Sequence, residues 1–159
     1  MRITKTVLFA AGVAVLPAML GLAGTASAAS IKEASTCPGA AAGLDNVGGP
    51  WYAYFDSAKT KVKADSRDHL RRAADTVKGR MAQTVCLQGM ADKQGNAAYN
   101  RKLALERSHQ VGQDLIALGV KPDVLLVVTG PQVGETLGGV SSEIDKQEQD
   151  RKVEIRIVK

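Results

Sequence analysis

The chain has 159 residues, 21 of them basic and 16 acidic, and carries a formal net charge of +5 at pH 7. A basic excess this mild gives no case for nucleic acid as a partner. The length suits one compact domain with a real hydrophobic core, preceded by a short leader.

Residues 1–28 have the pattern of an export signal. Two basic residues supply the positive start, residues 7–22 the apolar stretch, and residues 26–28, Ala-Ser-Ala, a cleavage site. We expect cleavage and a mature chain that begins near Ala29, with a retained membrane anchor as the alternative. No cysteine lies near the cleavage site, which argues against a lipoprotein anchor. The mature chain keeps 19 basic and 16 acidic residues, a net charge of +3.

Residues 29–50 are rich in Ala, Gly and Ser and show no apolar period, so we expect an irregular leader. Cys37 lies in this leader and Cys86 lies in the domain, and the chain has no other cysteine. In an exported protein a disulfide between them is the simplest interpretation. It would close a loop of about 50 residues and stabilise the fold by roughly 4 kcal/mol. Two unpaired thiols, with Cys86 as a small core residue, are the alternative.

Six segments with strand or helix periodicity follow the leader and make up the domain, residues 51–159. In chain order they are a strand at 51–55, a helix at 66–78, a strand at 84–89, a helix at 97–118, and strands at 124–128 and 152–159. Gly79 and Gly119 are expected to end the helices, and the polar residues 132–149 form a long loop. This β-α-β-α-β-β order predicts an α+β sandwich with both helices packed on one face of a mixed sheet.

The apolar positions of each segment predict which side faces the core. For the first helix they are Leu70, Ala73, Ala74 and Val77; for the long helix Leu105, Val111, Leu115, Ile116 and Leu118; and for the strands Val85, Leu87, Val153, Ile155 and Ile157.

A candidate binding site lies after the second strand. Asp92 closes the segment 89–92, Gly-Met-Ala-Asp, and Arg107 follows fifteen residues later in the long helix. Asn100 and Arg107 are seven residues apart, nearly two helical turns, so they share a stripe and Arg107 can face the loop of Asp92. A guanidinium meets a carboxylate through two parallel hydrogen bonds, and a carboxylate accepts from an ammonium. The pair predicts a noncovalent site for a zwitterionic amino-acid head. An internal salt bridge that braces the loop is the alternative.

Four blocks occur in order between about Tyr54 and Val158. They are Tyr-Phe-Asp-Ser-Ala-Lys at 54–59, Gly-Met-Ala-Asp-Lys-Gln-Gly at 89–95, Asn-Arg-Lys-Leu-Ala-Leu-Glu-Arg at 100–107, and Asp-Arg-Lys-Val-Glu-Ile at 150–155. These blocks resemble the aromatic-Phe-Asp opening, the Gly-His-Thr-Asp-x-x-Gly loop, the Asn-x-x-Leu-Ser-x-x-Arg helix and the Asn-Arg-Arg-Val-Glu-Ile strand of the OmpA-like domain family. The domain of that family is a peptidoglycan-binding module, found at the end of outer-membrane barrels, in the Pal lipoproteins and in flagellar stator proteins.

The resemblance implies noncovalent recognition of meso-diaminopimelate in the peptidoglycan stem peptide. It implies that Asp92 meets the ammonium group of diaminopimelate and that Arg107 meets its carboxylate. It also implies that Asn100 orders the loop and contacts the ligand, and that Arg151 lines the pocket. Met90-Ala91 departs from the usual His-Thr, so side-chain contacts from these two positions would be lost. The implied location is the periplasm. Association with the outer membrane would require a partner protein or a retained signal helix.

No nucleophile elbow, phosphate loop or pair of catalytic carboxylates is present, so we expect a binding protein that is not an enzyme and needs no cofactor. His69 and His109 have no partners at metal-ligand spacing, so we expect no metal site. The alternative function is interaction with another envelope protein by a domain that kept the fold and lost muropeptide binding.

Basic residues cluster around the first helix: Lys59, Lys61, Lys63, Arg67, Arg71 and Arg72. A solvated helix face is the simpler interpretation of such a cluster. The alternative is contact with anionic wall polymers or lipid headgroups.

Overall fold

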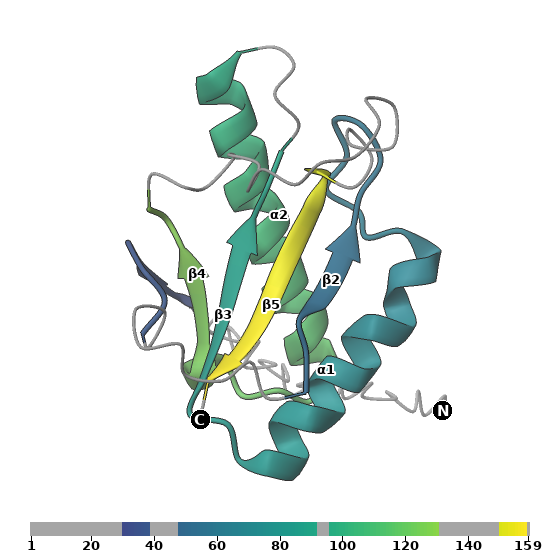
Figure 1. Ribbon diagram of the computed structural model, residues 1–159, viewed down its shortest axis with the longest axis vertical. Coiled ribbons are helices and arrows are strands. Elements are labelled where there is room, and N and C mark those ends of the chain that lie inside the picture. Colours follow the sequence, from purple (N-terminus) through teal and green to yellow (C-terminus); the bar gives the residue numbers. More distant parts are fainter. Residues whose placement is uncertain (1–29, 39–47, 92–95, 131–149, 159) are drawn as a thin grey trace, which may run out of the picture.

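A five-stranded mixed sheet with two helices forms the domain in the computed structural model, which describes residues 30–38, 48–91, 96–130 and 150–158 (Figure 1). The elements are β1 (Lys32–Ala34), β2 (Trp51–Tyr54), α1 (Arg67–Arg80), β3 (Thr84–Gly89), α2 (Ala97–Ala117), β4 (Leu125–Val128) and β5 (Lys152–Val158). The short 3-10 turns η2 (Ala64–Ser66) and η3 (Pro122–Val124) precede α1 and β4. The predicted export signal, the loop from 132 and Asp92 lie outside the described residues.

The strands are ordered β1-β4-β3-β5-β2 across the sheet. β4 runs parallel to both β1 and β3, whereas β5 pairs antiparallel with β3 on one side and β2 on the other. Strands β2, β3, β4 and β5 and both helices lie where the periodicity placed them, within a few residues at their ends. The predicted α+β fold is therefore confirmed.

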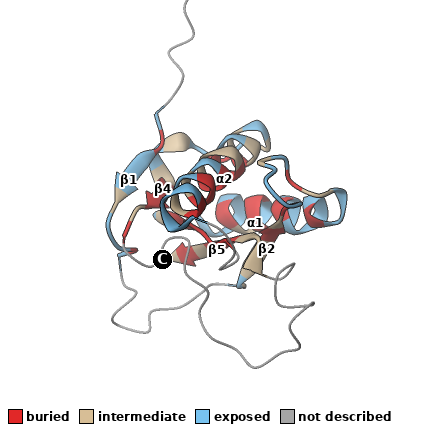
Figure 2. Cartoon of the chain, turned by 90° about the horizontal axis from the view of Figure 1, so that it is seen from above, coloured by how far each residue is buried: buried red, intermediate tan, exposed pale blue. Residues whose placement is uncertain are grey.

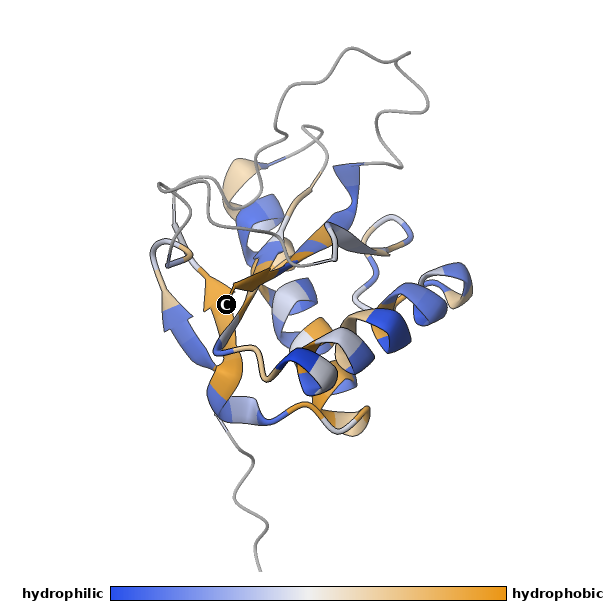
Figure 3. Cartoon of the chain, turned by 60° about the horizontal axis from the view of Figure 1, so that its bottom comes forward, coloured by the Kyte–Doolittle hydropathy of each residue, from blue (hydrophilic) through white to orange (hydrophobic). Residues whose placement is uncertain are grey.

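The main core fills the space between one face of the sheet and both helices (Figure 2). Leu70, Ala73, Ala74 and Val77 of α1 are all buried, as the three- and four-residue spacing predicted. The central strands are hydrophobic, and the outward sides of the helices are hydrophilic (Figure 3). Within the described ranges, neither helix is long and apolar enough to cross a membrane.

The two helices end differently from one another. α2 stops at Ala117, and Gly119 follows with φ +89°, so the expected glycine stop is present there. α1 runs through Gly79 to Arg80, and Met81 adopts the left-handed conformation with φ 49°. The prediction that Gly79 ends α1 is wrong because the chain needs a positive φ two residues later, where Ala82 N–H bonds back to the Val77 carbonyl at 3.2 Å.

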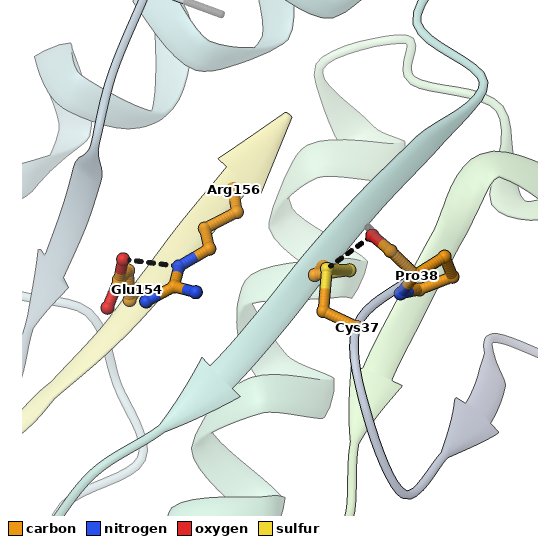
Figure 4. Close-up of a disulfide and its surroundings, with 5 residues drawn as sticks. Cys37, Pro38, Glu154 and Arg156 are labelled. Carbon is orange, nitrogen blue, oxygen red and sulfur yellow. Dashed lines mark hydrogen bonds and ion pairs between the residues drawn. A yellow bond between two sulfur atoms is a disulfide. The ribbon is translucent and has the colours of Figure 1, made fainter. Parts of the chain in front are cut away.

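The expected irregular leader contains an edge strand. β1 pairs with β4 from Lys32 opposite Leu126 to Ala34 opposite Val128. The structure joins Cys37 to Cys86 in a disulfide with 5.8 Å between the Cα atoms, on the sheet face away from the helices (Figure 4). A leader without apolar period is thus ordered by one short ladder and a covalent link.

Candidate functional site

The candidate site is built where β2 and β3 end and α2 and β5 begin, at the top of Figure 1. Gly89, the last residue of β3, lies so close to α2 that a Cβ there would collide with the backbone carbonyl of Ala104. Met90 follows and donates its N–H to the Lys152 carbonyl at 2.8 Å. Met90 and Ala91 are each only 2% exposed. The backbone that leads into Asp92 therefore departs from a fixed point between α2 and β5.

Arg107 is the largest fully buried side chain in the described part of the chain. Its Nε donates to the Lys59 carbonyl at 2.9 Å and its Nη2 to the Asp56 carbonyl at 3.0 Å. The guanidinium carbon lies 5.0 Å from the centroid of the Phe55 ring, a cation–π contact. Arg107 thus joins residues 55–63, the connection after β2, to the middle of α2. It donates to two backbone carbonyls of that connection.

Arg151 meets the same connection from the other side. Its Nε lies 3.4 Å from the Phe55 carbonyl, at the long end of hydrogen bonding, and its own carbonyl accepts from the Phe55 N–H at 2.9 Å. Phe55 itself has no exposed surface. Two of the predicted site arginines, 44 positions apart in sequence, therefore converge on one aromatic residue.

Asn100 lies in the first turn of α2 and is 8% exposed. The helix begins at Asn96, whose side-chain oxygen accepts the Tyr99 N–H at 3.1 Å and caps one of the open backbone donors. Asn100 shares the buried face of α2 with Arg107, as the seven-residue spacing predicted. Asp92 lies outside the described residues, so its contact with Arg107 or with a ligand stays a prediction.

The buried face of α2 contains the predicted Val111 and Leu115 but otherwise differs from the expected one. Leu105, Ile116 and Leu118 are only partly buried. The buried residues are Asn100, Leu103, Ala104, Arg107, Ser108, Val111, Gly112 and Leu115. Hydropathy could not identify this stripe as buried, because it contains polar residues and a hydropathy pattern assigns Arg and Asn to the solvent-exposed side.

Sequence reasoning also missed the carbonyls of Asp56 and Lys59 as partners of Arg107. The only available signal in the sequence was the Tyr-Phe-Asp block itself, in which Phe55 contacts both Arg107 and Arg151. Backbone acceptors leave no trace in residue type, and this pairing joins positions about fifty residues apart.

Residues 54–156 match the model of the OmpA family. Because this match spans well over half of the chain, the protein belongs to the OmpA family.

Outer membrane protein A of Bordetella avium is 27% identical over 105 residues, which cover 66% of this chain and 53% of that protein. The chain thus matches about half the length of this curated relative. Among solved structures, the peptidoglycan-associated lipoprotein of Burkholderia pseudomallei superposes with a TM-score of 0.59 at 23% identity, covering 67% of this chain and 88% of that one. The cell wall anchor of the type VI secretion system of Pseudomonas aeruginosa gives 0.52 at 23% identity, covering 66% and 74%. The two structural matches establish a shared fold.

Proposed function

We propose that the protein binds peptidoglycan noncovalently in the periplasm, through meso-diaminopimelate of the stem peptide. The observation that carries the proposal is the convergence of the family-matching blocks at one end of the sheet. Arg107 and Arg151 both contact Phe55 there, and the end of β3 delivers the chain toward Asp92. The names of the similar structures, a peptidoglycan-associated lipoprotein and a cell wall anchor, agree with this assignment.

Each residue has a defined role in the proposal. The Asp92 carboxylate accepts hydrogen bonds from the ligand ammonium, and the Arg107 guanidinium pairs with the ligand carboxylate. The two backbone carbonyls hold Arg107 in one orientation before ligand arrives, which lowers the entropic cost of binding. Asn100 and Arg151 border the site.

Full burial of Arg107 favours one alternative, an envelope protein-interaction domain in which the arginine is purely structural. Under the peptidoglycan proposal, neighbouring chain must move for a ligand carboxylate to reach this guanidinium. Under the alternative, the contacts of Arg107 stay closed and no muropeptide binds.

Co-sedimentation with purified diaminopimelate-type sacculi tests the proposal. Wild type should pellet, and free meso-diaminopimelate should release it. Asp92→Asn keeps the size of the side chain and removes its charge, so it should weaken binding about tenfold or more, the loss expected for a charge-assisted hydrogen bond.

Asp123→Asn is the matched control, because it neutralises an exposed carboxylate in η3, before β4. It should pellet like wild type. A folded wild-type protein that stays in the supernatant would rule out peptidoglycan binding and support the protein-interaction alternative.

A further inference from the structure

A cleft of about 480 Å³ lies between the connection after β2 and the two helices. Val62 and Leu70 form its floor, and Lys61, Arg67 and Arg71 line it as basic groups. The C-terminal half of α2 closes the other side with Gln110 and Asp114. Lys61, Arg67 and Arg71, which the sequence analysis assigned to a solvated helix face, therefore line one cleft.

The cleft carries an excess of positive charge. Among the described residues, neither Lys61 nor Arg67 forms an ion pair, and Arg71 pairs with Asp68 at 3.1 Å in a highly exposed contact of little strength. The single acid of the lining, Asp114, accepts a hydrogen bond from the Gln110 amide at 2.9 Å. An anionic ligand is the complement of this lining.

The cleft also has an apolar part, lined by Val62, Leu70, Ala117 and Leu118. Val62 is 6% exposed and Leu70 is 4% exposed, so they offer a shallow apolar surface. Ala117 is exposed and Leu118 is half-buried, so a methyl group of a ligand would find apolar partners there. Gln110 and Asp114 supply polar partners for peptide groups beside it. The chemistry fits an acidic peptide that also presents an apolar group.

The cleft adjoins the candidate diaminopimelate site. Arg107 holds the Lys59 carbonyl, and Lys61, two residues later, lines the cleft. Along α2, Asp114 follows Arg107 by two turns, a rise of about 10 Å. An extended peptide advances about 3.3 Å per residue, so three or four residues span the two sites.

We propose that this cleft is a second contact site for the peptidoglycan stem peptide, taking a carboxylate and a neighbouring methyl group of a peptide whose diaminopimelate is held at Arg107. The proposal rests on the peptidoglycan binding proposed above. It assigns Arg67 and Arg71 to the carboxylate and the apolar part at Leu118 to the methyl group. Ligands that present the whole peptide gain from the cleft, and free diaminopimelate does not.

The test compares two double variants of α1. Arg67→Gln/Arg71→Gln removes two charges from the cleft, and Arg72→Gln/Arg80→Gln removes two exposed charges of the same helix that do not line it. Binding to sacculi is measured by co-sedimentation and binding to free meso-diaminopimelate by calorimetry, after urea unfolding shows that both variants fold.

The cleft variant should bind sacculi about three- to tenfold more weakly than the control variant, as expected for losing partly exposed charge contacts. Both variants should bind free meso-diaminopimelate like wild type. If the two variants bind sacculi equally weakly, the proposal is overturned in favour of diffuse charge attraction. Unchanged binding of the cleft variant to sacculi would overturn it as well. Failure of wild type itself to bind sacculi would instead defeat the peptidoglycan function and this site with it.

Discussion

Arg107 is a charged side chain with no exposed surface, a situation that is costly unless the charge is paired or hydrogen-bonded. Here two backbone carbonyls and the Phe55 ring surround the guanidinium. The same contacts fix the connection after β2, whose next residues line the interhelical cleft. Loss of binding on replacing Arg107 therefore has two possible origins, and stability must be measured beside it.

Arg107→Met should destabilise the fold by about 3 kcal/mol, because two buried carbonyls lose charge-assisted donors while an unbranched apolar stem is kept. Urea unfolding monitored by circular dichroism measures the change. Arg72→Met, an exposed position of α1, should stay within about 0.5 kcal/mol of wild type. Equal stabilities for the two variants would show that the Arg107 contacts add nothing to the fold.

At the scale of elements, β1 is the unusual member because three residues make too short a strand to stay paired by its ladder alone. Two anchors flank it. Ile31 fills the space above Gly112 of α2, where a Cβ would collide with its side chain, and Cys37 is bonded to Cys86 in β3. By covering β4, the leader also removes a hydrophobic sheet edge that could pair with another chain.

Replacing both cysteines, Cys37→Ala/Cys86→Ala, should lower the unfolding free energy by about 4 kcal/mol through the loop that the disulfide closes. Amide hydrogen exchange should accelerate in residues 125–128 as β1 detaches. Reduced wild type is the control and should behave likewise. Unchanged protection of β4 in the variant would mean that Ile31 holds β1 without the disulfide.

For the whole molecule, the two faces of the sheet differ in chemistry. The face away from the helices carries a polar row in which Arg156 Nε donates to Glu154 at 2.7 Å and the Lys152 ammonium lies 4.8 Å from the Tyr52 ring centroid. Burial raises the pKa of Tyr52, and Glu154 raises it further. Burial also raises the pKa of Tyr54, with a smaller contribution from Asp65.

These pKa shifts predict a loss of stability at alkaline pH. The folded state keeps the tyrosine protons that the unfolded state releases near pH 10, so the stabilisation is complete below that pH and disappears as pH rises through the folded-state pKa values. Urea unfolding between pH 9 and 12 measures the decline. Tyr52→Phe/Tyr54→Phe should show a shallower decline, and an identical decline would assign the alkaline loss to other groups.

Helix α2 shows which structural features can be predicted from local sequence patterns and which cannot. Its start, its glycine stop and the shared face of Asn100 and Arg107 all follow from spacing, since capping and helical period act within a few residues. Its inner face was predicted only at Val111 and Leu115, because a buried arginine breaks the hydropathy rule on which that prediction depends. The backbone carbonyls of Asp56 and Lys59, which make the burial of Arg107 tolerable, lie about fifty residues away in the sequence.

Sequence alone therefore specified the element order and the α+β class, because hydrophobic period and turn residues are read over short windows. The four family blocks were identified by resemblance. Only the tertiary structure placed the leader at the edge of the sheet, because three residues of strand carry no period of their own. It likewise brought Arg107 and Arg151 to Phe55 and gathered Arg67, Arg71 and Asp114 around one cleft. Those contacts join segments distant in the chain, and their geometry exists only once both helices pack on the sheet.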